Sequence, residues 1–78
     1  MEIKILGSGC AKCKKLEQAA TDAVNELNLT ASVDKVEDMM EIIGYGVAMT
    51  PAMVVDGQVM LKGRTASVEE IKKLLTNK

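Results

Sequence analysis

Aromatic side chains are almost absent from this sequence of 78 residues. It contains no Trp and no Phe, and its one aromatic residue is Tyr45. Single-stranded nucleic acids are often bound by stacking their bases on aromatic rings, and this chain lacks a set of rings for that purpose. Six methionines are present, and because Met is unbranched and polarisable, we expect them to fill the core in place of aromatic residues.

Long apolar runs and a strong net charge are also missing. No segment comes near the length of about 20 apolar residues that a membrane span requires. Met1 leads into a charged, alternating segment, which is not the pattern of a signal peptide. The net charge of −1 attracts neither nucleic acid nor an anionic membrane. We therefore expect a cytoplasmic monomer, with a single domain over residues 1–78 and no nucleic-acid or membrane partner.

Histidine is absent, and the two cysteines lie three residues apart in the segment GSGCAKCKK. Cys10 and Cys13 can therefore form a redox dithiol, part of a metal site or a structural disulfide. A disulfide across so short a loop stabilises little and seldom persists in the cytosol. A closed Zn site needs two further ligands, whereas two thiolates alone can hold Cu(I). A soft-metal site thus stays the main alternative to redox chemistry, and a partner-binding module without catalysis is a third.

Hydrophobic patterns predict the order strand, helix, strand, helix, hairpin, helix. The expected elements cover residues 2–6, a helix from 10 to 27, residues 30–36, 38–43, 53–55 with 58–61, and 67–75. Asp56-Gly57 is typical of a type I′ hairpin turn. Gly44 is expected to end the second helix. Ser67 and Glu70 have the spacing of a capping box at the start of the last helix.

The two cysteines are expected to differ in environment. Cys10 lies where the first helix begins, and the free N–H groups and the helix dipole there favour a thiolate. Lys12 lies between the cysteines and is expected to tune Cys10. Cys13 follows one turn later on the apolar face, at a separation that suits a disulfide. We therefore predict that Cys10 is exposed and attacks a substrate disulfide, and that Cys13 is sheltered and resolves the mixed disulfide.

These motifs together resemble a known family. Gly-x-Gly-Cys-x-x-Cys after a first strand, Thr-Pro before a hairpin, and a capped last helix are similar to the thioredoxin fold. More narrowly, they resemble the small redox-active disulfide proteins, which are glutaredoxin-like and thioredoxin-like. The resemblance covers the whole chain. It implies an α/β fold of order βαβαββα, with a central four-stranded mixed sheet flanked by three helices.

The resemblance also implies a function, a site and partners. It implies a thiol–disulfide oxidoreductase in which Cys10 is the nucleophile and Cys13 the resolving thiol, without a cofactor other than the redox-active Cys10–Cys13 disulfide. The Thr50-Pro51 bond is expected to be cis. The expected substrate-binding residues are Gly9, Lys12, Met49, Thr50 and Pro51. Among these, Met49 either lines the substrate groove or fills the core.

The expected partners are a protein disulfide and a source of electrons. That source is either a thiol reductase similar to thioredoxin reductase or a low-molecular-weight thiol. The residues between the cysteines, Ala11 and Lys12, match neither the Gly-Pro of thioredoxins nor the Pro-Tyr of glutaredoxins. The sequence therefore leaves the choice of electron donor open.

Overall fold

The elements follow one another in the order βαβαββα in the computed structural model, which describes residues 1–7 and 11–76. They are β1 (Glu2–Leu6), α1 (Ala11–Glu26), β2 (Ser32–Val36), α2 (Met39–Gly44), β3 (Ala52–Val55), β4 (Gln58–Lys62) and α3 (Val68–Thr76). The predicted order is confirmed, and so is the predicted α/β fold class. The first strand has the predicted bounds, whereas the second begins two residues later than expected.

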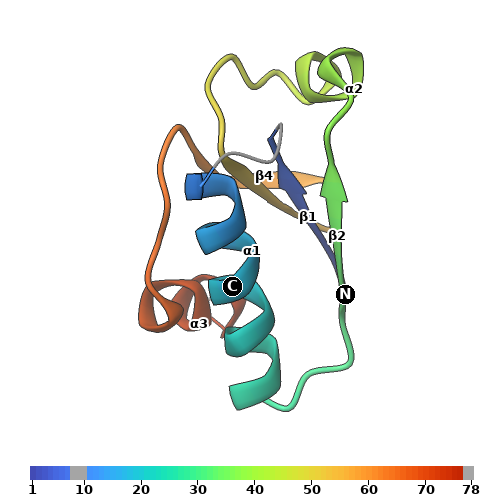
Figure 1. Cartoon of the computed structure of the whole chain (residues 1–78). Coiled ribbons are helices and arrows are strands. Elements are labelled where there is room, and N and C mark those ends of the chain that lie inside the picture. Colours follow the sequence, from blue (N-terminus) through green and yellow to red (C-terminus); the bar gives the residue numbers. More distant parts are fainter. Residues whose placement is uncertain (8–10, 77–78) are drawn as a thin grey trace.

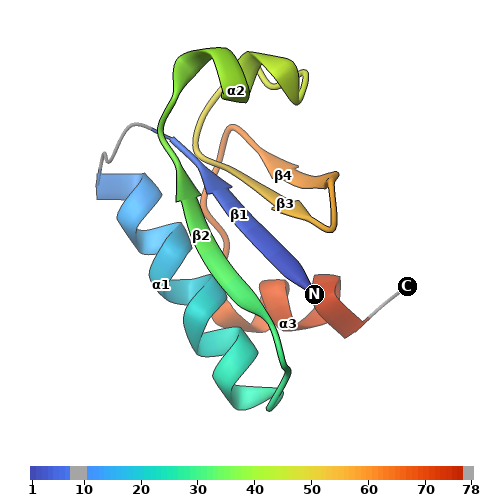
Figure 2. The ribbon, with the colours of Figure 1, turned by 90° about the vertical axis from the view of Figure 1, so that its right-hand side faces the viewer.

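The four strands form one mixed sheet in the order β2-β1-β3-β4 (Figures 1 and 2). β1 pairs in parallel with β2 and antiparallel with β3, and β3 pairs antiparallel with β4. Leu6, the last residue of β1, lies opposite both Val36 at the end of β2 and Ala52 at the start of β3. The chain segments beyond these three residues therefore meet at one end of the sheet.

Each face of the sheet buries its own apolar cluster. The larger cluster joins β1, β3 and β4 to α1 and α3, which lie together on one face (Figure 1). Its fully buried members include Ile5, Leu16 and Ile71. The smaller cluster lies where α2 covers the end of the other face, and it includes Leu6 and Ile42. α2 is therefore held over the end of the sheet at which the three strand ends meet.

The turn of the hairpin has the predicted form. Asp56 and Gly57 both have positive φ values, 50° and 83°, as a type I′ turn requires. Asp56 also accepts a hydrogen bond from the backbone N–H of Glu2 at 2.8 Å. The turn is thereby joined to the first residue of the central strand.

The end of α2 and one half of the predicted capping box differ from the structure. Gly44 is the last helical residue of α2, and the left-handed position is taken by Gly46, with φ 79°. The N–H of Gly46 donates to the carbonyl oxygen of Ile43, and the helix ends one residue later than predicted. Ser67 caps α3 by accepting from the N–H of Glu70, as expected. The Glu70 carboxylate, however, binds the guanidinium of Arg64 through both oxygens.

The prediction that the methionines fill the core is wrong for three of them. Met53 is fully buried, but Met39, Met40 and Met49 are 63%, 75% and 67% exposed. Small residues on α1, such as Ala20, are fully buried in the larger cluster. The core therefore needs little side-chain volume. Within residues 1–7 and 11–76, no helix has the length and apolar character needed to cross a membrane.

Candidate functional site

A buried sulfur lies at the end of the sheet where the strand ends meet. Cys13, in the first turn of α1, is only 6% exposed because its side chain points toward the sheet. A Cβ atom at position 7 would lie 2.3 Å from the Sγ of Cys13 and 3.9 Å from the Cα of Pro51. Gly7, Cys13 and Pro51 are therefore neighbours, although they come from three separate segments. The close approach is possible because residue 7 has no side chain.

Hydrogen bonds from the backbone hold two sides of this arrangement. The N–H of Gly7 donates to the carbonyl oxygen of Val36 at 3.0 Å, which fixes the residue against the end of β2. The N–H of Gly63 donates to the carbonyl oxygen of Pro51 at 2.9 Å, which fixes the proline beside the end of β4. The Cys13 side chain is thus packed between backbone segments that the sheet positions.

The Thr50-Pro51 peptide bond is cis, as the resemblance implied. Pro51 is buried, whereas Thr50 is exposed. Met49 is also exposed and lies against Gly63, where an added Cβ would be 3.4 Å from the Met49 Cβ. The alternative that Met49 fills the core is wrong. Its assignment to the substrate groove stays a prediction.

The other predicted site residues are Cys10, Gly9 and Lys12. Cys10 and Gly9 lie outside the described residues. Lys12 is exposed in the first turn of α1. Of the predicted site residues, Cys13 and Pro51 are the two that the described part of the chain brings together, on either side of Gly7. Gly7, which the sequence analysis gave only as the first glycine of the Gly-x-Gly-Cys-x-x-Cys motif, is a further residue of this site. The signal for it was a glycine directly after the central strand.

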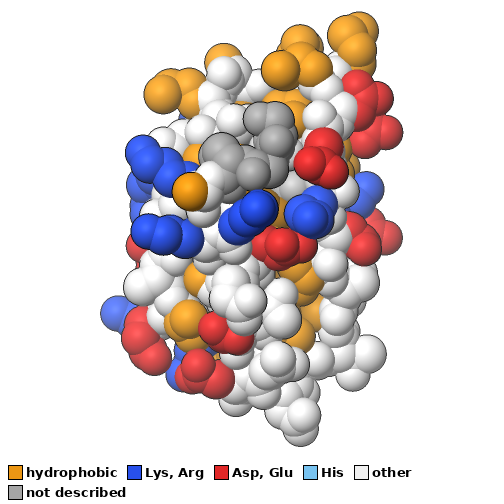
Figure 3. Space-filling model, in the orientation of Figure 1, with side chains coloured by type: hydrophobic (Ala, Val, Ile, Leu, Met, Phe, Trp, Pro, Cys, Tyr) orange, Lys and Arg blue, Asp and Glu red, His pale blue; other side chains and the backbone are white. Residues whose placement is uncertain are grey.

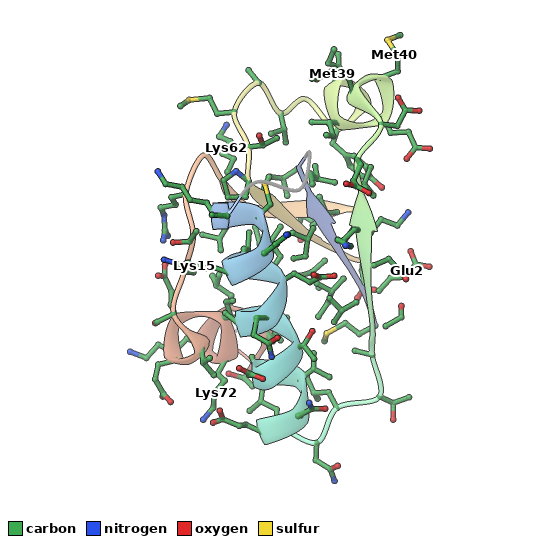
Figure 4. The ribbon with its side chains drawn as sticks, viewed as in Figure 1. Glu2, Lys15, Met39, Met40, Lys62 and Lys72 are labelled. Atoms are coloured by element: carbon green, nitrogen blue, oxygen red, sulfur yellow. The ribbon has the colours of Figure 1, made fainter. Side chains whose placement is uncertain are left out.

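Basic side chains gather on one side of this end of the molecule, and acidic side chains lie mainly on the other, with some basic ones among them (Figure 3). Lysines project from the start of α1 and from the end of β4, where Lys15 and Lys62 are labelled in Figure 4. The segment that leads into α2 and the helix itself carry acidic residues instead. The exposed acidic side chains there are Glu37, Asp38 and Glu41.

A side-chain contact joins α2 to the central strand. Lys4 of β1 and Tyr45, which caps the end of α2, share a hydrogen bond that raises the pKa of Lys4 above its ordinary value. The nearby phenol and the carboxylates of Glu2 and Glu41 act in the same direction. Lys4 is therefore fully charged at neutral pH. Within the described ranges, no group of three or more Cys, His, Asp or Glu side chains is arranged to hold a metal ion.

The fold and the site together define a class of protein. A βαβαββα chain with the sheet order β2-β1-β3-β4, a cysteine in the first turn of α1 and a cis-proline before the hairpin is a thioredoxin-like α/β protein. The comparison with known families agrees. The family model described as the thioredoxin domain matches residues 1–76, and the chain belongs to this family.

Two similar proteins are both named thioredoxin. One, from Methanothermobacter thermautotrophicus, is 45% identical over 76 residues, which cover 97% of this chain and 99% of the relative. The other, from Methanocaldococcus jannaschii, is 40% identical over 73 residues, which cover 94% of this chain and 84% of the relative. The family and these relatives support, in general terms, a thiol–disulfide oxidoreductase function.

Proposed function

We propose that the chain exchanges electrons with protein disulfides through Cys10 and Cys13. The Cys10 thiolate attacks one sulfur of the substrate disulfide and expels the other as a thiolate, which takes up a proton. The Cys13 thiolate then attacks the Cys10 sulfur, releases the second substrate thiol and leaves a Cys10–Cys13 disulfide. The substrate thereby gains two electrons and two protons, and the protein dithiol loses them.

The observation that carries the proposal is the place of Cys13. Its sulfur is buried against Gly7 and beside the cis-proline, so external disulfides have little access to it. A sulfur in such a position suits the second, internal step. The substrate chain would lie along Thr50 and Pro51, with Lys12 and Met49 at its sides. A thiol reductase or a low-molecular-weight thiol would return the electrons.

Single-cysteine variants test the two roles. Cys13→Ser should accumulate a mixed disulfide between Cys10 and the substrate, because the resolving thiol is missing. Cys10→Ser should accumulate none, since the remaining sulfur is buried. Non-reducing gel electrophoresis followed by mass spectrometry of the trapped peptide identifies the linked cysteine. Trapping by Cys10→Ser alone would contradict the assignment.

A further inference from the structure

Four exposed lysines lie around the buried sulfur and the cis-proline. They are Lys12, Lys14, Lys15 and Lys62, and together they are called the basic surface below. The first three belong to the beginning of α1, where they precede and follow Cys13. Lys62 ends β4 and is followed by Gly63, whose N–H donates to the carbonyl oxygen of Pro51. Because Cys13 and Pro51 are neighbours through Gly7, the lysines of both elements flank the same site.

The basic surface is open to solvent and keeps its charge. Figure 4 shows Lys15 and Lys62 on the side of α1 that the segment between β4 and α3 follows, and basic side chains gather on this side in Figure 3. In the part of the chain that the structure describes, ion pairs involve Arg64 and Lys72 and none of the lysines of the basic surface. Their charges are therefore available to a partner.

The acidic side chains nearest along the chain do not neutralise the basic surface. Glu17 of α1 is partly buried, and the carboxylate of Glu70 is held by the guanidinium of Arg64 through both oxygens. Glu41 of α2 lines a separate cavity that also contains Lys4. A partner that approaches Cys13 from the side of α1 therefore meets an excess of positive charge.

Given the function proposed above, we propose that the basic surface receives an acidic segment of the protein substrate. The segment carries Asp or Glu on both sides of its disulfide, and these carboxylates lie against the lysines while Cys10 attacks. The lysines come from two elements that flank Pro51, so a chain segment contacts several of them at once, whereas a small anion reaches one or two. Opposite charges at exposed positions act mainly on the rate of association, so the preference depends on ionic strength.

Two disulfide peptides test the charge preference. Both contain the same intramolecular disulfide, which is flanked by two Glu in one peptide and by two Lys in the other. The protein is reduced with dithiothreitol, desalted and mixed with each peptide in a single turnover. Each second-order rate constant is divided by that of dithiothreitol with the same peptide, which removes the intrinsic difference between the two disulfides. At about 20 mM salt we expect the Glu peptide to react at least about fivefold faster, and the ratio to fall toward one at about 0.5 M salt.

Reversal of charge tests the part of the basic surface in this preference. Lys15→Glu combined with Lys62→Glu leaves two lysines and two carboxylates there, so the ratio at low salt should fall close to one. Both positions are exposed, so the fold should be retained, and circular dichroism checks this. Each single substitution should lower the ratio about twofold. Lys73→Glu, at an exposed position of α3, is the matched control for the single substitutions and should leave the ratio unchanged.

A small anionic disulfide separates an acidic protein segment from a small anion. Dithiodiglycolate carries two carboxylates but does not extend over the basic surface. Its rate constant should change less than about twofold in the double variant, whereas that of the Glu peptide should fall at least about fivefold. Equal losses for the two would assign the lysines to small anions and would overturn the inference.

The remaining outcomes separate this inference from the proposed function. Equal normalised rate constants for the two peptides, or an unchanged ratio in the double variant, would overturn the inference while 2-hydroxyethyl disulfide, which is small and neutral, is still reduced. Failure of the native protein to reduce 2-hydroxyethyl disulfide would instead contradict the proposed function itself.

Discussion

The missing side chain at residue 7 leaves the space that the Cys13 sulfur occupies. An added Cβ would lie 2.3 Å from that sulfur and 3.2 Å from the Cys13 Cβ, so Gly7→Ala requires the cysteine side chain or the helix to shift. We expect a loss of about 1–3 kcal/mol in the free energy of unfolding, which is typical of an overpacked core. We also expect slower resolution of the mixed disulfide. Urea unfolding and single-turnover kinetics measure the two effects.

Gly44→Ala is the matched control for that substitution. Gly44 is the last residue of α2, and an added Cβ there would meet nothing within 4 Å. Alanine is favoured over glycine in helices, so this variant should be as stable as the native protein or up to about 1 kcal/mol more stable. If both variants lost the same stability, the contact between residue 7 and Cys13 would not be the cause.

At the scale of single elements, the hairpin depends on one side chain with two roles. Asp56 adopts a positive φ of 50° and accepts a hydrogen bond from Glu2. Asp56→Ala removes the acceptor and places a less suitable residue in the left-handed region, so we expect a loss of about 1–2 kcal/mol in unfolding free energy. Asp56→Asn keeps an acceptor and tolerates the conformation, and it should lose less than half as much. Equal losses in urea unfolding would contradict this reading.

The ion pair between Arg64 and Glu70 at the start of α3 makes a contribution to the stability of the fold that depends on pH. The hydrogen bond with Arg64 lowers the pKa of Glu70 below its ordinary value. A lowered folded-state pKa contributes stability above the unfolded-state pKa, and this contribution is lost as the pH falls through the folded-state value. Both side chains are well exposed, at 53% and 39%, so the effect is small.

A double-mutant cycle isolates this pair. Arg64→Gln, Glu70→Gln and the double variant should show a favourable coupling at about pH 7 that is smaller at about pH 2.5, because the carboxylate takes up a proton as the pH falls through its lowered folded-state pKa. The cycle cancels the separate interaction of Glu70 with the helix dipole. Urea unfolding at both pH values gives the coupling. A coupling that is equal at the two pH values would show that charge does not hold the pair together.

At the scale of the whole molecule, the chain topology could be predicted from local signals. The alternating residues of β1, the apolar face of α1, Asp56-Gly57 and the Ser67 cap each specify an element, and their order leaves few ways to form the sheet. The contact between Gly7 and Cys13 could not be predicted in this way. It depends on how closely α1 approaches the end of β1, which no local pattern encodes.

For a related reason, the sequence could not predict that Met39 and Met40 are exposed. α2 has six residues, of which Ile42 is buried, so the helix is too short for its apolar pattern to define one inner face. Which side of it faces the sheet is decided by β2, Val47 and Tyr45, which pack against it. The apolar composition of the segment therefore predicted burial, whereas the three-dimensional packing leaves Met39 and Met40 in contact with solvent.

The methionines should consequently differ in their reaction with hydrogen peroxide. Peroxide transfers one oxygen atom to a thioether and leaves water, and the rate depends on access to the sulfur. Met39, Met40 and Met49 are exposed and should form sulfoxides at least about tenfold faster than Met53, which is fully buried and reacts only when the fold opens. Peptide mapping by mass spectrometry over time measures each rate.

The unfolded protein provides the control for these rates. In concentrated urea all four methionines should oxidise at similar rates, because the difference comes from the fold and not from local sequence. Rapid oxidation of Met53 in the native protein would contradict its place in the core.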